Sequence, residues 1–166
     1  SVMRMGAIPN ANSEKKEISL DFIFEGLPNE KFKAKIIKFL ETKSERFPWL
    51  FNFHLKMEST NTFPHSSGIA SSASSMSALN LCLLELDEKI KGHKSDPTDF
   101  YKEASDLSRQ ASGSAARSVY PFLVSWGEIE TIPKTSNFFA QPINKENVHE
   151  IFHNYCDSIL IVDSGE

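Results

Sequence analysis

The sequence has few cysteines and no long apolar run, and each shortage excludes a class of protein. Its two cysteines, Cys82 and Cys156, form no Cys-x-x-Cys pair and no cluster with histidines at metal-ligand spacing. This excludes a zinc-ribbon type of site. The absence of any run of 18 apolar residues excludes a predicted transmembrane helix. No secretory signal is recognisable either, and we expect a cytoplasmic protein.

The sequence also has fewer basic than acidic residues. The 166 residues include 18 Lys and Arg against 22 Asp and Glu, which gives a net charge of −4. Nucleic acids and anionic membranes attract cationic surfaces. We therefore expect no nucleic-acid partner and no membrane partner, although a local basic site for a small anion remains compatible with this balance.

Apolar residues alternate in two stretches, which predicts two half-buried strands. In the first, Ile18, Leu20, Phe22 and Phe24 share one face. The second covers residues 51–58, with Phe51 inward and His54 on the polar face. Further strands are expected over 122–126 and 159–162. Residues 1–17 show neither period, so we expect an irregular arm or a remnant foreign to the fold.

Three other stretches have helical spacing. They cover residues 29–43, 69–90 and 100–111, the last with a cap at Asp96 or Thr98. The order is strand, helix, strand, two helices, strand, strand. It predicts an α+β fold, with a mixed or antiparallel sheet and helices packed on it.

The start of the second predicted helix has an unusual composition. "STNTFPHSSGIASSASSMSA" holds eight serines in twenty residues and runs directly into a Leu-rich helix. The first N–H groups of a helix lack partners and lie at the positive end of its dipole, so they bind anions readily. Small residues there also permit close helix packing. The composition alone leaves both interpretations open.

The spacing in this stretch resembles the phosphate-binding signature of the GHMP superfamily of small-molecule kinases. Pro-x-x-x-Gly-Leu/Ile-x-Ser-Ser-Ala is matched in order by Pro64, Gly68, Ile69, Ser71, Ser72 and Ala73. "STNTFPHSSGIASSAS" also resembles the form of this signature in diphosphomevalonate decarboxylases. Downstream, "LSRQASGSAARSVYPFLVSW" is similar to the second block of that family, Gly-Ser-Gly-Ser-Ala-Cys-Arg-Ser followed by an aromatic strand.

The resemblance implies a role for each matched position. It implies that Ser71 and Ser72 meet the phosphates of ATP and a Mg²⁺ ion, within a loop formed by Pro64, Gly68, Ile69, Ala70 and Ala73. Ser112, Gly113 and Ser114 are implied to bind mevalonate 5-diphosphate. Arg117 matches the family's catalytic arginine, which orients the substrate carboxylate; a guanidinium can form two parallel hydrogen bonds with such a group. Arg109 is expected to be structural.

The sequence departs from the family pattern at several points. Ala111 and Ala116 stand where the family has Gly and Cys, and the first change matters only if that position needs a positive φ or a very close backbone approach. The family's Lys-Tyr-Trp-Gly-Lys segment has no match before Ile18, and its catalytic aspartate would follow Glu166. We therefore expect residues 18–166 to form a GHMP-type (ribosomal protein S5 domain 2-like) nucleotide-binding domain, truncated at both ends.

The resemblance implies ATP-dependent decarboxylation of mevalonate 5-diphosphate to isopentenyl diphosphate, in the mevalonate pathway of isoprenoid biosynthesis. We expect this chain alone to be inactive. Two alternatives remain: a GHMP small-molecule kinase, or a non-catalytic fragment that binds nucleotide or diphosphate. Family members are commonly dimers, which makes a homodimer an expectation, although no patch in the sequence identifies an interface.

Overall fold

A computed structural model gives the fold, and it describes residues 1–10, 17–63, 70–154, 156 and 158. The chain divides into two compact units. Unit 1 comprises residues 1–62 and 78–95, and unit 2 comprises residues 63–77 and 96–166. Among the described helices, none combines the length and apolar character needed to cross a bilayer.

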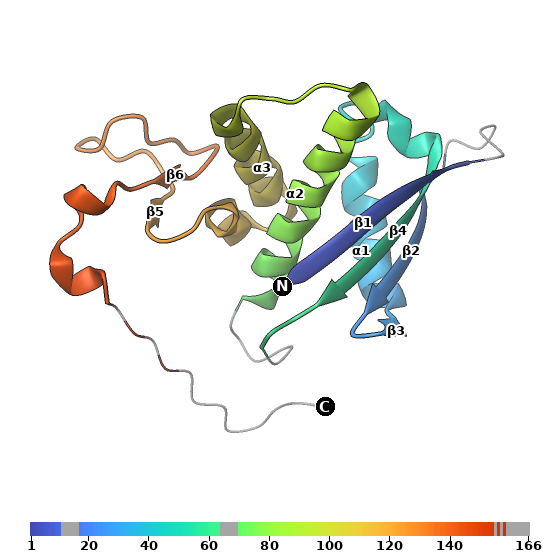
Figure 1. The fold of residues 1–166 in the computed structure, drawn as a ribbon, viewed down its shortest axis with the longest axis horizontal. Coiled ribbons are helices and arrows are strands. Elements are labelled where there is room, and N and C mark those ends of the chain that lie inside the picture. The colour runs from blue at the N-terminus through green and yellow to red at the C-terminus, as the bar shows by residue number, and fades with distance from the viewer. Residues whose placement is uncertain (11–16, 64–69, 155, 157, 159–166) are drawn as a thin grey trace. The chain divides into compact units, whose positions relative to one another are not determined.

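Unit 1 contains a four-stranded mixed sheet (Figure 1). Its strands are β1 (Val2–Pro9), β2 (Ser19–Phe24), β3 (Leu27–Pro28) and β4 (Phe53–Thr60), in the order β1-β4-β2-β3. β2 and β4 are parallel, and the other two pairs are antiparallel. The predicted inward residues face each other across the parallel pair: Leu20 lies opposite Leu55, and Phe22 opposite Met57, and all four are buried. The predicted mixed sheet is confirmed.

The first residues of the chain form an edge strand, so the prediction of an irregular arm is wrong for residues 2–9. β1 pairs along its whole length with β4. Its side chains do alternate, with Met3 and Met5 half-buried, but the outward positions include Val2 and Ile8. Apolar residues on both faces hide the two-residue period on which strand prediction depends.

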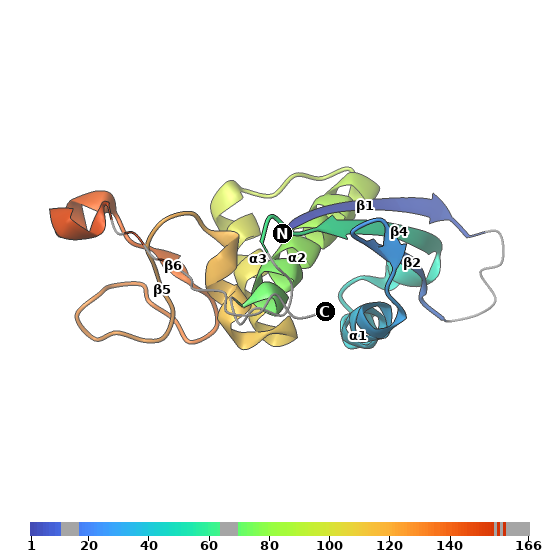
Figure 2. The ribbon, with the colours of Figure 1, turned by 90° about the horizontal axis from the view of Figure 1, so that it is seen from below.

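Helix α1 (Glu30–Glu41) covers one face of this sheet (Figure 2). The Asn29 side chain caps it by accepting a hydrogen bond from the Phe32 N–H at 2.9 Å. The Phe32 ring lies 5.3 Å from that of Phe22 on β2, and Ile36 is fully buried. Helical spacing thus gave the correct element and the correct buried face.

The second predicted strand begins two residues later than expected. Phe51 belongs to the 3-10 helix η1 (Pro48–Phe51), because Pro48 starts a tight turn there, and β4 begins only at Phe53. His54 lies on the polar face, as predicted. Its ring nitrogens are 2.7 Å from Ser19 Oγ and 3.1 Å from an oxygen of Asp21. These contacts tie β4 to β2.

Helix α2 (Ser71–Lys91) matches the predicted long helix. Within unit 1 its last turns are fixed by Asp87, whose buried carboxylate accepts hydrogen bonds from Trp49 at 2.8 Å and Arg46 at 3.1 Å. Lys91 adds an ion pair at 2.8 Å. Burial alone raises the pKa of Asp87, but the hydrogen bonds from Lys91, Trp49 and Arg46 outweigh it and lower the pKa overall.

Unit 2 is built around α3 (Pro97–Ala111), which Asp96 caps, as predicted, through the Thr98 N–H. After it come the 3-10 helix η2 (Gly113–Val119), the short antiparallel strands β5 (Val124–Ser125) and β6 (Gln141–Pro142), and the turns η3 (Lys145–Asn147) and η4 (Glu150–Phe152).

The predicted strand over 122–126 shrinks to the two residues of β5. Phe122 adopts a φ of 62°, in the left-handed region, and is 82% exposed. A left-handed residue cannot continue an extended strand, so its apolar character was a misleading signal. The strand predicted over 159–162 lies outside the described residues.

The first prediction concerns Asp87. Asp87→Asn should lower the free energy of unfolding at pH 7 by about 2–3 kcal/mol, because hydrogen bonds to a buried charge are lost or weakened. The folded pKa lies below the unfolded value of about 3.9. The contribution is therefore complete above that pH and disappears as the pH falls through the folded pKa.

Urea unfolding at pH 7 and at low pH measures this effect. The wild type and the variant should converge in acid, while Glu41→Gln, an exposed control on α1, should match the wild type at both pH values. An Asp87→Asn deficit that persists unchanged in acid would contradict the assignment.

Candidate functional site

The start of α2 is formed by a residue with strained backbone. Ala70 adopts a φ of 54°, and its carbonyl accepts hydrogen bonds from the N–H groups of Ala73 and Ser74 at 3.0 and 3.2 Å. The Ala70 side chain is a methyl group and cannot accept a hydrogen bond from the first N–H groups of the helix. The N–H groups of Ser71 and Ser72 come before the first intrahelical bonds, which leaves them at the positive end of the helix dipole.

Exposure along this first turn separates polar positions from anchoring ones. Ser72 is exposed and Ser71 is half-buried, while Ala73 and Met76 are buried. The serine hydroxyls and N–H groups are therefore presented at the end of a helix whose next turn is fixed in the core. Pro64, Gly68 and Ile69, the other predicted residues of this loop, lie outside the described residues.

The second predicted block forms η2 and the junction before it. Ser112 ends α3 by donating its N–H to the Ser108 carbonyl at 2.9 Å, and its own carbonyl accepts from Ala115 at 2.7 Å. In a 3-10 helix, residues three apart lie above each other. Ser114 and Arg117 therefore share an exposed side, while Ala115 lies on the buried side.

The two arginines of this region have different surroundings. Arg109 bonds to an oxygen of Asp106 at 2.6 Å and to the Phe138 carbonyl at 2.9 Å, and its guanidinium lies 5.6 Å from the Phe138 ring centre. Its charge is satisfied within the protein. Arg117 is exposed and forms no ion pair with any of the residues that the structure describes. Within the described part of the chain, its guanidinium therefore lacks the protein partners that Arg109 has.

A buried serine connects η2 to the rest of unit 2. The fully buried Ser105 hydroxyl donates to the Ala116 carbonyl at 2.7 Å and accepts from the Ala140 N–H at 2.8 Å. At the start of η2, the ring of Trp126 lies close to Gly113: its Cη2 atom is 3.7 Å from the position that a Cβ on this residue would occupy. Sequence reasoning missed Ser105, because nothing distinguishes it from the other serines of α3.

Two positions depart from the family pattern. Ala111 is the last residue of α3 and is not among the described residues with positive φ, so its backbone conformation does not call for glycine. Ala116 is fully buried, which suits a small side chain in place of cysteine.

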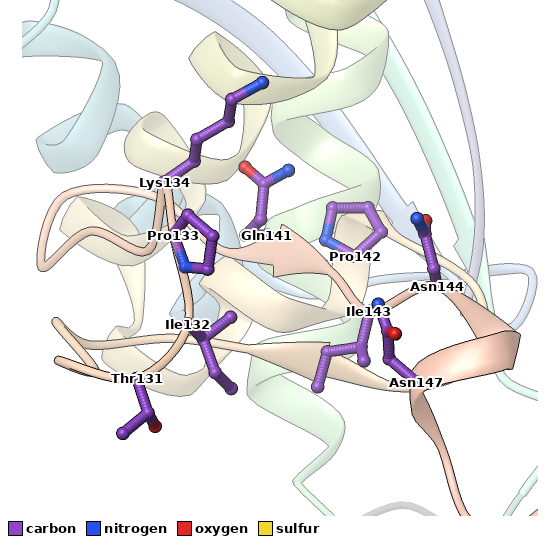
Figure 3. A pocket seen from close by; sticks show the side chains of 9 residues that line it. All are labelled: Thr131, Ile132, Pro133, Lys134, Gln141, Pro142, Ile143, Asn144 and Asn147. Carbon is purple, nitrogen blue, oxygen red and sulfur yellow. The ribbon is translucent and has the colours of Figure 1, made fainter.

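A pocket of about 590 Å³ lies elsewhere in unit 2 (Figure 3). Its walls come from two segments, 131–134 and 141–147, and none of the predicted site residues lines it. It is therefore separate from the predicted site, and the irregular connection that forms it carried no periodic signal.

The two predicted blocks, residues 70–73 and 112–117, belong to the same compact unit. Together they offer serine hydroxyls, helix-end N–H groups and the guanidinium of Arg117, which has no ion pair within the described residues. In the described part of the chain, no group of three or more His, Cys, Asp and Glu side chains could hold a metal ion. This chemistry favours binding of phosphate and carboxylate groups.

The family model for the diphosphomevalonate decarboxylase-like N-terminal domain matches residues 9–138. The chain belongs to the diphosphomevalonate decarboxylase-like N-terminal domain family. This confirms the family resemblance seen in the two serine-rich blocks.

Curated diphosphomevalonate decarboxylases are similar over part of this domain. The enzyme of Eremothecium gossypii is 37% identical over 87 residues, which cover 52% of the chain and 20% of the relative. The enzyme of Ganoderma lucidum is 35% identical over 106 residues, which cover 64% of the chain and 24% of the relative. The chain thus spans about a quarter or less of the length of these relatives.

Solved structures agree with this family domain. Mevalonate diphosphate decarboxylase from Staphylococcus aureus superposes with a TM-score of 0.60 at 28% identity, over 87% of this chain and 39% of that one. The enzyme from Enterococcus faecalis superposes with a TM-score of 0.56 at 31% identity, over 82% of this chain and 38% of that one. A further solved structure is described as a complex with MVAPP, AMPPCP and magnesium. It is 31% identical, with a TM-score of 0.55, over 82% of this chain and 37% of that chain. The predicted α+β fold of the family is confirmed.

The second prediction concerns the left-handed Ala70. Alanine in this region costs about 1–2 kcal/mol relative to glycine, offset by glycine's larger unfolded-state entropy of about 0.5–1 kcal/mol. Ala70→Gly should therefore raise the free energy of unfolding by up to about 1 kcal/mol in a denaturant titration. The control Ala78→Gly, in the interior of the same helix, should lower it. Destabilisation by Ala70→Gly would show that the backbone there is not left-handed.

Proposed function

We propose that this domain serves the ATP-dependent decarboxylation of mevalonate 5-diphosphate to isopentenyl diphosphate, as one portion of the enzyme. The observation that carries the proposal is Arg117, an exposed guanidinium with no ion pair among the described residues. It lies on the same side of η2 as the Ser114 hydroxyl. Arg109, only eight positions earlier, is occupied by protein groups and cannot take this role.

In this proposal the start of α2 holds the nucleotide. The N–H groups and hydroxyls of Ser71 and Ser72 would bind phosphate oxygens, within the loop formed by Pro64, Gly68, Ile69, Ala70 and Ala73. The donor set fits this task, because it combines helix-end N–H groups that precede the first intrahelical bonds with small side chains that permit close approach. Mg²⁺, bound together with the phosphates, would neutralise charge that develops during phosphoryl transfer.

Arg117 acts on the other substrate. The reaction transfers the terminal phosphoryl group of ATP to the tertiary 3-hydroxyl, and phosphate and CO₂ then leave. Arg117 would hold the carboxylate through two hydrogen bonds, so that the breaking C–C bond is aligned with the departing phosphate. Ser112, Gly113 and Ser114 would bind the diphosphate or carboxylate beside it. A homodimer and a cytoplasmic location stay predictions.

The third prediction tests the role of Arg117 in the natural full-length protein. Arg117→Ala should lower kcat for CO₂ and isopentenyl diphosphate formation by on the order of 100- to 1,000-fold, because a charged donor aimed at the reacting group is lost. Arg117→Lys should recover only part of this loss, since an ammonium group cannot form the two-pronged contact.

Arg4→Ala, an exposed change on β1 in unit 1, is the matched control and should leave kcat unchanged. Full turnover by Arg117→Ala would overturn the assignment. Formation of ADP and a stable phosphorylated product without CO₂ would instead identify a small-molecule kinase, and nucleotide binding without turnover would identify a binding fragment.

A further inference from the structure

We infer that Ser105, a buried residue of α3 outside the predicted site, is a positioning residue for Arg117. The inference rests on the proposed function, because it names a residue that supports the same site. Ser105 is fully buried and contacts neither nucleotide nor substrate in the proposal. It acts through the backbone of η2.

The contact falls at the peptide unit that precedes Arg117. The Ser105 hydroxyl donates to the Ala116 carbonyl at 2.7 Å. This carbonyl and the Arg117 N–H belong to one planar peptide group. Fixing the carbonyl therefore fixes the plane from which the Arg117 side chain departs.

The hydroxyl itself is held in one orientation. It accepts the Ala140 N–H at 2.8 Å, so its single hydrogen is directed to the Ala116 carbonyl. Two hydrogen bonds in series also polarise each other in a buried site. Arg109 holds the same segment by donating to the Phe138 carbonyl at 2.9 Å, so residues 138–140 are tied to α3 at two points.

The 3-10 helix needs such external support. Its hydrogen-bond geometry is poorer than that of an α-helix, and runs of more than three or four residues are uncommon. η2 nevertheless extends over seven residues, Gly113–Val119. Without the bond from Ser105, the Ala116 carbonyl would keep only the bonding of the 3-10 helix itself, and rotation of this peptide would redirect Arg117.

Another serine of α3 supplies a matched control. Ser108 lies one turn further along the helix and is equally buried, but its hydroxyl has no hydrogen-bond partner among the described residues. Ser108→Ala and Ser105→Ala thus make the same chemical change at the same depth in the same helix. Only Ser105→Ala removes hydrogen bonds between the side chain and the backbone.

The fourth prediction uses a double-mutant cycle in the natural full-length protein. Ser105→Ala should lower kcat for isopentenyl diphosphate formation by on the order of 10- to 100-fold, the range expected for a displaced reacting group, with little change in KM for ATP. Ser108→Ala should keep wild-type kcat. In an Arg117→Ala background, Ser105→Ala should cause no further loss, because its effect passes through Arg117.

Equal losses from Ser105→Ala in both backgrounds, or equal losses from Ser105→Ala and Ser108→Ala, would overturn the inference. Ser105→Cys, nearly the same size with a weaker donor, gives the same cycle if Ser105→Ala does not fold.

Hydrogen exchange of residues 113–119 tests the inference even if the protein lacks decarboxylase activity. Exchange there should accelerate in Ser105→Ala or Ser105→Cys and not in Ser108→Ala, and unchanged exchange would refute the positioning role.

Discussion

The Ser105 hydroxyl donates to the Ala116 carbonyl and accepts from the Ala140 N–H, so one buried atom joins α3, η2 and the segment before β6. An unsatisfied buried carbonyl or N–H costs about 1–3 kcal/mol, and the serine satisfies one of each. These hydrogen bonds hold the buried side of η2, and its exposed side carries the polar side chains of Ser114 and Arg117.

The same division between a fixed base and an open polar end recurs at α2. Its first residues, Ser71 and Ser72, present hydroxyls and N–H groups, while Ala73 and Met76 are buried. At its far end, Asp87 collects three cationic or N–H donors, which anchors that end within unit 1. Preorganised donors of this kind suit phosphoryl transfer, where catalysis depends mainly on positioning and electrostatic stabilisation.

Much of the fold could be predicted from residue periods, because burial on one face imposes them. The β2 strand, α1, α2 and α3 all follow from this rule. β1 was missed because Val2 and Ile8 face outward, and Phe122 misled because its backbone is left-handed. At the site, motif spacing predicted Ser71, Ser72 and Arg117 as binding or catalytic residues, and these roles stay predictions. Ser105 was not predictable, because its importance lies in two backbone partners 11 and 35 residues away.

We propose above all that the guanidinium of Arg117 holds the substrate carboxylate that later leaves as CO₂. A crystal structure of the natural full-length protein with mevalonate 5-diphosphate and a non-hydrolysable ATP analogue tests it most directly. We expect two nitrogens of Arg117 at about 2.7–2.9 Å from the two carboxylate oxygens, with the Ser105–Ala116 hydrogen bond intact. A substrate carboxylate held by other groups, with Arg117 directed into solvent, would contradict it.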